Sequence, residues 1–387
     1  ALPISLDLST FYYSKISDFS YLFSDCNKLK ELSMINFKGA NVRNRMDYMF
    51  YNCKSLIVVN LMNLDLGKTY NISGLFNGCV SLLLLNIQNN GFAVIQDYSY
   101  MFNNCFSIMA IKIISLVNSK VDNIMDYMFN NCTNLNRVDF TLGYSNYYSS
   151  STKSMRYMFN NCSSLTDSGV LNMMVNGESD LSYMFNNCTS LVYFYINKKI
   201  FFRSKNYSKI INFQYMFNNC TRLEKVDLSN FKINHKVNLK GIFSNCISLI
   251  DINMYQFQLP NAIDLSYLFQ NCTSLTYIKL SSLNNLTQYN TIEGMFYNCH
   301  NLLSLNLLEF DTSKTTNMKF LFYNCSKLTS LDLITLKTSS VANMNSLFSN
   351  CISLKSLNLS FFNTKSVIDM SKNVSKLCVN KNFILKF

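Results

Sequence analysis

The chain has 387 residues, of which 49% are hydrophobic, 14% aromatic and 14% charged. This composition is too apolar for a disordered chain, and apolar runs such as those at 56–59 and 82–85 are far shorter than the ~18 residues that a membrane-spanning helix needs. The formal charge of +12 comes from lysines and arginines scattered mostly singly along the chain, a pattern typical of solubility and of weak attraction to polyanions. We therefore expect no transmembrane segment and no nucleic-acid groove.

The first residues have the pattern of a repeat that is already under way. Leu6, Leu8 and Phe11 match the end of the repeat described below, and no polar cap precedes them. The chain begins with Ala1 and shows no basic segment followed by an apolar one, so we expect either a signal peptide that has been removed or a fragment. Residues 1–25 are predicted to form a partial rung.

An internal repeat is marked by the cysteines. They recur every 26 or 27 residues, with two longer intervals of 30 and 32. A fixed period in this range is typical of a solenoid built from one repeated unit. The fourteen cysteines are Cys26, Cys53, Cys79, Cys105, Cys132, Cys162, Cys188, Cys220, Cys246, Cys272, Cys299, Cys325, Cys351 and Cys378.

The segment before each cysteine is predicted to be a short helix. Apolar residues seven, four and three positions before the cysteine, such as Met125, Met128 and Phe129, have the spacing of one helical stripe. Eight positions before it, 11 of the 13 aligned copies have Asp, Asn, Ser or Thr, which indicates an N-cap. Arg45 and Ile124 are the exceptions, so we expect those two turns to fray or to be capped in another way.

The residue immediately before the cysteine is Asn in eleven copies, which predicts a left-handed turn there. After the cysteine, apolar residues at plus three, plus six and plus eight form the pattern LxxLxL, as in Leu328, Leu331 and Leu333. This pattern predicts a short strand, and an apolar residue at plus eleven usually closes the coil. One unit buries too few apolar side chains to offset its ordering entropy, so copies must stack.

We therefore predict a single α/β leucine-rich-repeat solenoid over residues 1–387. It has about fourteen rungs, each with a short parallel strand, a turn and a short helix. Residues 26–377 form twelve to thirteen full repeats, and residues 378–387 form a partial rung or cap.

The two long intervals place inserts after the strand in nearby rungs. The insert at 141–152 is rich in tyrosine, which suits adaptable contacts, and the insert at 198–209 is basic, which suits an acidic partner. The simpler interpretation is two solvated loops. The candidate partner-binding residues are Tyr144, Tyr147, Tyr148, Lys198, Lys199, Arg203 and Lys205.

The segment 305–333, LNLLEFDTSKTTNMKFLFYNCSKLTSLDL, resembles the BspA-like leucine-rich-repeat surface proteins, including the variant found in mycoplasma surface lipoproteins. The resemblance runs from Leu6 to about Met370. It implies a location outside the cell or on its surface and a role in adhesion or in surface coats. The chain departs from the family pattern in having no lipidated cysteine box at its start, so lipid anchoring is not supported.

The cysteines allow two interpretations. They can be buried thiols that act as small apolar residues, or adjacent rungs can be paired by disulfides, since a rung spacing of ~4.8 Å lies within the Cα range of a disulfide. Cys378 persists in a last copy that has lost its other signature residues, so Cys351 and Cys378 are the candidate pair. A metal site is not expected, because ligands on one ladder cannot surround an ion.

Asn-x-Ser/Thr sequons are frequent, and six of them are the turn Asn before the cysteine. That Asn persists where no sequon follows, so the turn explains it better than glycosylation does. In a secreted eukaryotic protein the exposed sites would still be candidates. They are Asn71, Asn131, Asn161, Asn187, Asn206, Asn219, Asn271, Asn285, Asn324, Asn358 and Asn373.

Catalytic chemistry is not expected. His235 and His300 are the only histidines, they lie in different rungs, and no nucleophile or carboxylate accompanies them. Glycine-rich phosphate loops are absent from a chain with only ten glycines. We predict a non-enzymatic protein without cofactors.

Two functions stay open. The favoured one is an extracellular structural protein that assembles head to tail with copies of itself into a filament or surface coat. The alternative is a monomeric surface adhesin or receptor ectodomain that binds a protein or glycan ligand, and a weaker third option is an intracellular scaffold. The candidate self-assembly residues at the two ends are Leu6, Leu8, Phe11, Phe383, Ile384 and Phe387.

Overall fold

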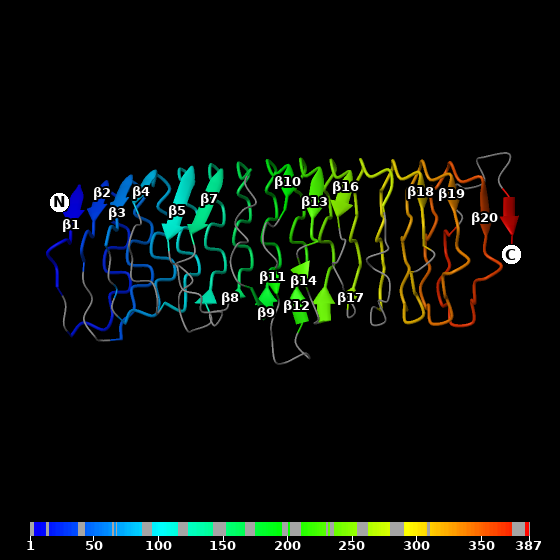
Figure 1. The fold of residues 1–387 in the computed structure, drawn as a ribbon, viewed down its shortest axis with the longest axis horizontal. Helices are drawn as coiled ribbons and strands as arrows, with labels where there is room; N and C mark the ends of the chain where they lie inside the picture. The colour runs from blue at the N-terminus through cyan, green and yellow to red at the C-terminus, as the bar shows by residue number, and fades with distance from the viewer. Residues whose placement is uncertain are drawn as a thin grey trace. The chain divides into compact units, whose positions relative to one another are not determined.

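The computed structural model describes residues 4–12, 15–37, 43–63, 66, 68–86, 95–114, 123–141, 152–166, 175–195, 200–201, 210–229, 231–232, 236–253, 262–278, 290–307, 310–373 and 384–386. The chain forms two compact units, residues 1–191 and 192–387. In both units, short strands from successive repeats pair in parallel (Figure 1).

The first unit has one ladder of strands at the positions that LxxLxL predicts. β1 (Ser5–Asp7), β2 (Glu31–Ser33), β3 (Val58–Asn60) and β4 (Leu84–Asn86) form a four-stranded parallel sheet, and β5 (Ala110–Ile114) pairs with β7 (Arg137–Thr141). The plus-six residues pair with one another, as Leu32 with Val59, and both are buried. These strands follow one another along one edge of the unit in Figure 1.

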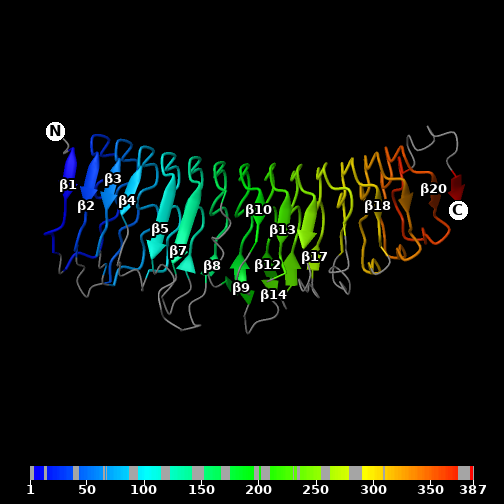
Figure 2. The same cartoon turned by 45° about the horizontal axis from the view of Figure 1, so that its top comes forward.

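A second parallel ladder runs through the positions predicted as helix caps. Single bridges join Asp18 to Arg45, Arg45 to Asn71, Asn71 to Asp97 and Asp97 to Ile124. The ladder continues in β6 (Asn123–Ile124), β8 (Thr152–Ser154) and β9 (Val175–Asp180). In Figure 1, β8 and β9 lie along the edge opposite to β5 and β7, and Figure 2 shows the same strands with the view turned by 45°.

The second unit repeats this plan. Its first ladder contains β10 (Tyr193–Phe194), β13 (Lys225–Asp227) and β16 (Asp251–Asn253), then the pairs β18 (Ser304–Leu305) with β19 (Ser330–Leu331) and β20 (Ser356–Asn358) with β21 (Ile384–Lys386). Its second ladder contains β12 (Ile210–Asn212), β15 (Lys236–Asn238) and β17 (Ala262–Asp264), followed by the bridges Thr291–Asn317–Asn343–Asp369. β11 (Ile200–Phe201), within the second insert, pairs with β14 (Phe231–Lys232).

The prediction of a helix in each rung is wrong, because the described residues contain no helix. The predicted α/β solenoid is therefore a β-solenoid. In its place is a run of turns whose alternate N–H groups donate to the next rung. In the rung of Cys132, Met125, Tyr127, Phe129 and Asn131 donate to carbonyls of residues 154, 156, 158 and 160 at 2.8–2.9 Å. We call this arrangement the turn ladder.

Two residues with positive φ per rung break the helix. The N–H groups of Met128, Asn130 and Cys132 bond back three residues, which closes successive turns. Tyr127 and Asn131 have φ of 57° and 60° and occupy the third position of two of these turns, where a type II turn requires positive φ. The apolar spacing that predicted a helix is met equally well by these turns, because each returns the chain to the core after three or four residues.

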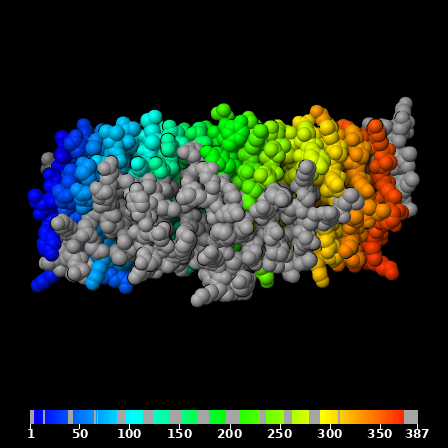
Figure 3. Space-filling model, viewed as in Figure 1, coloured from blue at the N-terminus to red at the C-terminus, as the bar shows by residue number. Residues whose placement is uncertain are grey.

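Stacked phenylalanines occupy the centre of the core. The Phe three positions before each cysteine stacks on its counterpart in the next rung, with ring centroids 5.4–5.8 Å apart, from Phe23 to Phe185 in the first unit. The same ladder joins Phe217 to Phe348 in the second unit, with centroids 5.7–5.8 Å apart. Within each unit, rungs follow one another in chain order, as the colours of the space-filling view in Figure 3 show.

Candidate functional site

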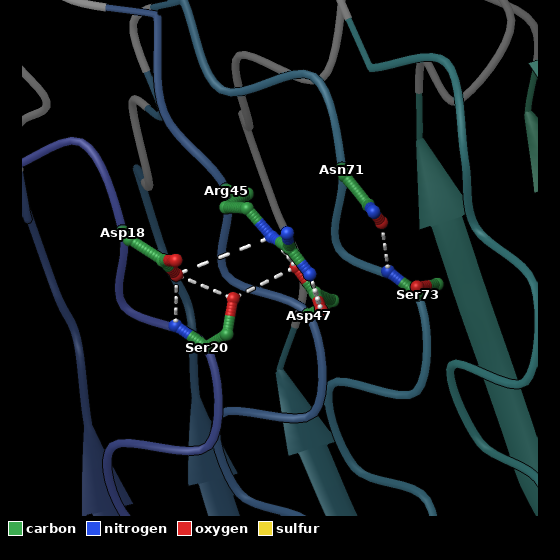
Figure 4. A network of polar contacts seen from close by, with 6 residues as sticks. All are labelled: Asp18, Ser20, Arg45, Asp47, Asn71 and Ser73. Atoms are coloured by element: carbon green, nitrogen blue, oxygen red, sulfur yellow. Dashed lines mark hydrogen bonds and ion pairs between the residues drawn. The ribbon is translucent and has the colours of Figure 1, made fainter.

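The residues eight positions before the cysteine use their side chains as predicted, although in a turn and not at a helix end. Asp18 and Asn71 accept hydrogen bonds from the N–H groups of Ser20 and Ser73, each at 2.8 Å (Figure 4). The same bond recurs at Asp97, Asp180, Asn212, Asn238, Asp264, Asn317 and Asn343, and at Asp369, which lies nine positions before Cys378.

The two exceptions, Arg45 and Ile124, are each followed two residues later by an aspartate. Asp47 makes an ion pair with Arg45 at 2.5 Å and accepts a hydrogen bond from the Ser20 hydroxyl at 2.9 Å (Figure 4). Burial alone would raise the pKa of Asp47, but the bonds from Arg45 and Ser20 outweigh it and hold the pKa below its ordinary value. After Ile124, Asp126 accepts the N–H of Arg156, in the following rung, at 2.9 Å. The Arg45 turn is therefore stabilised by another group, as one of the two expectations had it, whereas Asp126 serves the turn of the next rung and the capping of the Ile124 turn stays a prediction.

The cysteines form a ladder of buried free thiols. Cys26 is half-buried, and in eleven of the later rungs the Sγ donates a hydrogen bond to the carbonyl of the core Phe in the preceding rung, as Cys132 does to Phe102 at 3.1 Å and Cys325 to Phe296 at 3.2 Å. Cys351 is also free and donates to Phe322 at 3.0 Å. The structure gives no support to pairing Cys351 with Cys378, which lies outside the described residues.

Burial makes these thiols poor nucleophiles. It raises the pKa of Cys53, Cys132, Cys299 and Cys351 to about 12 and raises the pKa of Cys105 well above its ordinary value. Since the thiolate is the reactive form, none of these residues is suited to nucleophilic or metal chemistry at neutral pH. Among the described residues, no group of three or more His, Cys, Asp or Glu side chains is placed to hold a metal ion.

The turn Asn residues are held by the fold itself. Asn131, Asn161 and Asn187 each donate from Nδ2 to the Oδ1 of the corresponding Asn in the preceding rung, at 2.6–2.8 Å. Asn271 and Asn324 do the same at 2.6 and 2.9 Å. The left-handed backbone and the ladder of amide hydrogen bonds together explain why Asn precedes the cysteine. Glycosylation at these positions therefore stays a prediction.

The other sequons differ in exposure. Asn358 is exposed, Asn71 and Asn219 are half-buried, and Asn373 is buried. Asn206 and Asn285 lie outside the described residues. On exposure alone, Asn358 is the most accessible of these sites.

A tyrosine ladder runs beside the Asn ladder. Tyr100, Tyr127, Tyr157 and Tyr183, all with positive φ, stack at 4.6–4.8 Å between ring centroids. Gly74, Gly241 and Gly294 take this position in three rungs, and there the tyrosine of the preceding rung covers the glycine. The ladder offers ring edges and hydroxyl groups to a ligand, since the ring faces cover one another.

An exposed apolar cluster lies on the strand side of the first unit. Ile57, Leu83, Leu84, Phe106 and Met109 are 37–58% exposed. Their rungs are neighbours: Leu83 donates its N–H to the Ile57 carbonyl at 3.0 Å, and Ser107 donates to the Val80 carbonyl at 2.8 Å. We call these five residues the strand-face patch.

The fold does not require apolar residues at these positions. The position four residues after the cysteine, which Ile57, Leu83 and Met109 occupy, holds Lys30 and Asn136 in the flanking rungs, and both are exposed. Sequence analysis missed this patch because it followed only the positions held constant among repeats. The available signal was an apolar residue at an otherwise variable position in three consecutive copies.

The predicted partner-binding inserts lie mostly outside the described residues. Tyr144, Tyr147, Tyr148, Lys198, Lys199, Arg203 and Lys205 lie outside the described residues. His235 also lies outside them, while His300 is half-buried in a turn, with its N–H on the Asn298 carbonyl at 2.9 Å. The absence of an enzyme active site therefore stays a prediction.

The candidate end residues are described in part. Leu6 lies in β1 opposite Leu32, Leu8 donates its N–H to the Ser33 carbonyl at 2.8 Å, and Phe11 stacks on Phe37 at 6.1 Å between centroids. Ile384 lies in β21, opposite Ser356. Phe383 and Phe387 lie outside the described residues. Where the structure describes the chain, no helix is long and apolar enough to cross a bilayer.

Repeated LxxLxL strands in parallel ladders define a leucine-rich-repeat β-solenoid. The model of a family described as "Mycoplasma protein of unknown function, DUF285" matches residues 3–114, 70–198, 179–303 and 290–382. The chain therefore belongs to this family, which confirms the resemblance to the mycoplasma repeats. No curated protein matches the sequence.

Solved structures give distant similarities. A leucine-rich cell surface protein from Faecalibacterium prausnitzii is 16% identical with a TM-score of 0.34, over 79% of this chain and 83% of that one. A leucine-rich repeat protein from Eubacterium ventriosum is 14% identical with a TM-score of 0.31, over 89% and 81%. An internalin from Listeria monocytogenes is 15% identical with a TM-score of 0.27, over 94% and 81%.

Proposed function

We propose that this chain is an extracellular repeat protein that binds a protein partner through the strand-face patch. The observation that carries this proposal is the patch itself: five half-exposed apolar side chains on neighbouring rungs, at positions where the fold accepts polar residues. A contiguous exposed apolar cluster is typical of a protein interface, whereas apolar residues scattered singly are not.

The surroundings of the patch favour a partner with acidic groups. Lys30 and Lys54 are exposed on one side of it, and Arg137, paired in register with Ala110, is exposed on the other. Glu31, in β2, and Asp139, in β7, are acidic residues at this edge. An apolar centre with a charged, solvent-accessible rim is the usual anatomy of an interface, and the basic rim speeds encounter with an acidic surface.

A flat protein surface fits the patch better than a lipid bilayer does. The patch side chains are 37–58% exposed, so they lie partly against their own rungs and do not project as an inserting wedge. Since interfacial insertion places an apolar face ~5–10 Å deep, these side chains are poorly suited to it.

The test is a crosslinking experiment on the full chain displayed on cells. A photo-reactive amino acid replaces Leu84 or Met109, and the matched controls carry it at Tyr277 or Ile250, which are exposed at the corresponding repeat positions in the second unit. We expect one discrete adduct from the first pair only, reduced about tenfold or more by Leu83→Lys. Equal adducts from both pairs would contradict the assignment.

Extracellular placement has its own test, because it rests on the family's surface-protein resemblance. Added protease should cleave the chain on intact cells while a cytosolic marker survives. Protection of the chain in intact cells would favour the intracellular scaffold instead.

Head-to-tail assembly is the second candidate. It is favoured by β1 and β21, which pair in the same parallel sense as the inner strands, so that strand addition between copies keeps the same geometry. We expect negative-stain images to show filaments that lengthen with concentration and that Leu6→Lys shortens. Discrete monomers at high concentration would exclude head-to-tail assembly into filaments.

A further inference from the structure

The net positive charge of the chain belongs to one of its two units. Residues 1–191 contain 13 basic and 13 acidic residues, whereas residues 192–387 contain 21 basic and 9 acidic ones. The whole formal charge of +12 therefore belongs to the second unit. Such an asymmetry between halves indicates an electrostatic partner for one of them.

The first unit serves as an internal control for the origin of this charge. Both units are built from the same repeat, with the same two ladders and the same Phe core. A bias toward lysine in the whole gene would raise the charge of both units. The excess in the second unit is therefore not explained by such a bias or by the needs of the fold.

Much of this charge is free to meet a ligand. Arg222, Lys225, Lys236, Lys327 and Lys355 are exposed, and where the structure describes the second unit none of the five is within ion-pair distance of a carboxylate. The ion pair described in this unit joins Lys337 to Asp311 at 3.2 Å. In the first unit, Arg45 and Arg156 are paired with aspartates, and its 13 basic residues are balanced in number by 13 acidic ones.

The five basic residues lie at different points around the coil. Arg222 and Lys327 follow the cysteine by two residues, and Lys355 and Lys225 lie at or beside the first strand ladder. Lys236 lies in β15, in the second ladder. A flat membrane would contact one side only, whereas a flexible polymer can follow charge on several sides.

We propose that residues 192–387 bind an anionic polysaccharide, a chain bearing sulfate or carboxylate groups. The choice of a polysaccharide over a nucleic acid rests on the extracellular placement proposed above. The charge itself rests on residue counts and exposure, and so it survives if the strand-face patch has no protein partner.

The test compares two variants of the full chain that lose the same charge. The second-unit variant carries Arg222→Gln, Lys225→Gln, Lys236→Gln, Lys327→Gln and Lys355→Gln. The first-unit control carries Lys15→Gln, Lys28→Gln, Lys30→Gln, Lys54→Gln and Lys112→Gln, all exposed. Binding to heparin, a sulfated polysaccharide, is measured at several salt concentrations, because each released counterion contributes to the salt dependence of binding.

We expect the second-unit variant to bind heparin about tenfold or more weakly, with a shallower salt dependence, and the control to stay within about twofold of the parent. Equal losses in both variants would overturn the proposal, since binding would then follow net charge alone. Tighter binding of the parent to single-stranded DNA or to vesicles with anionic lipid than to heparin would overturn the choice of polysaccharide.

A second measurement needs no variant. Lysine acetylation of the parent chain, with and without heparin, is mapped by mass spectrometry. We expect protection of Lys225, Lys236, Lys327 and Lys355 and none of Lys15, Lys28 or Lys54. Protection concentrated in the first unit would contradict the assignment independently of any folding defect in the variants.

Discussion

The thiol of each ladder cysteine combines two properties that the core of a rung requires. It fills a small apolar space, and its S–H donates a hydrogen bond to the carbonyl of the Phe in the preceding rung. Alanine would supply only the first property, and serine would bring a more polar hydroxyl into the same space.

The raised thiol pKa values predict a loss of stability in alkali. In the folded chain the pKa of Cys132 and Cys299 is about 12, against an ordinary value of 9.0. Between these values the unfolded chain has lost the thiol proton while the folded chain keeps it, so unfolding is favoured as pH rises. Below pH 9 the contribution is constant. We expect the urea midpoint to fall between about pH 9 and 12.

A variant with Cys79, Cys105, Cys132 and Cys162 replaced by Ala provides the control. Its midpoint is lower at neutral pH because of the lost packing, but it should decline less steeply in alkali. Tyr98, whose pKa is also raised by burial, is present in both proteins and cancels. Equal slopes would show that the thiols do not cause the decline.

The glycines of the tyrosine ladder give a prediction about backbone strain. Gly241 has φ of 59°, and an added Cβ would lie 2.1 Å from Cε1 of Tyr215. We expect Gly241→Ala to lower the free energy of unfolding by about 1–3 kcal/mol. In a double-mutant cycle, the cost of Gly241→Ala should be smaller when Tyr215 is also replaced by Ala, because the clash with the ring is gone and only the backbone strain is left. If Gly241→Ala had no cost at all in the Tyr215→Ala background, the positive φ would carry no strain.

At the residue scale, sequence analysis identified which positions matter but not always why. The Asn before the cysteine was predicted from its tolerance of a left-handed turn, and it has positive φ in rung after rung. The positive φ of Tyr127 and its counterparts gave no such signal, because tyrosine is not a residue that favours it. Only the glycines at the same position in other copies pointed to it.

At the scale of the element, the turn ladder replaces the predicted helix because stacking supplies acceptors that an isolated segment lacks. A helix satisfies its N–H groups internally, whereas here the N–H of Phe129 reaches the Met158 carbonyl at 2.9 Å. Periodicity alone could not separate the two, since both return apolar side chains to the core. The strand that follows was predictable because LxxLxL has an alternation that turns do not share.

Circular dichroism provides a direct check of this correction. We expect a far-ultraviolet spectrum dominated by strands and turns, without the paired minima near 208 and 222 nm of a helix. A helix in each of the thirteen aligned repeats would give those minima strongly. A helical spectrum would therefore contradict the turn ladder.

The Phe ladder predicts a dependence on position within the stack. Phe159 is fully buried between Phe129 and Phe185, so Phe159→Ala should cost about 3–5 kcal/mol. Phe23 is only half-buried, and Phe23→Ala should cost less than half as much. Chemical denaturation of both variants tests this, and equal costs would show that the stack adds nothing beyond local packing.

At the scale of the whole molecule, rung-to-rung contacts predict that complete repeats can be removed. Deletion of residues 247–272, which are 26 residues, joins Cys246 to Thr273 and lets the Asn298 amide meet Asn245. We expect a folded protein with a lower urea midpoint, because stability in such arrays is a sum of neighbouring interfaces. Deletion of residues 247–259, half a repeat, should abolish cooperative unfolding, and survival of both deletions would contradict the rung as the unit.

Family membership and the repeat could be predicted from sequence, whereas the surfaces that carry function could not. Repeats are visible because the same residue types recur at Cys132, Cys162 and their counterparts. The strand-face patch depends on Leu83 and Met109 at positions that vary, and the charge asymmetry becomes meaningful only once the two units are known.

The turn ladder also gives the stack a direction. Every crossing N–H in it donates toward the following rung, while each ladder thiol donates toward the preceding one. The two sides of a rung are therefore chemically different, and a new rung fits only in the orientation of its neighbours. Tandem duplication of one repeat within the gene supplies that orientation automatically, so the family can change the length of its members by copying errors while every existing contact is kept.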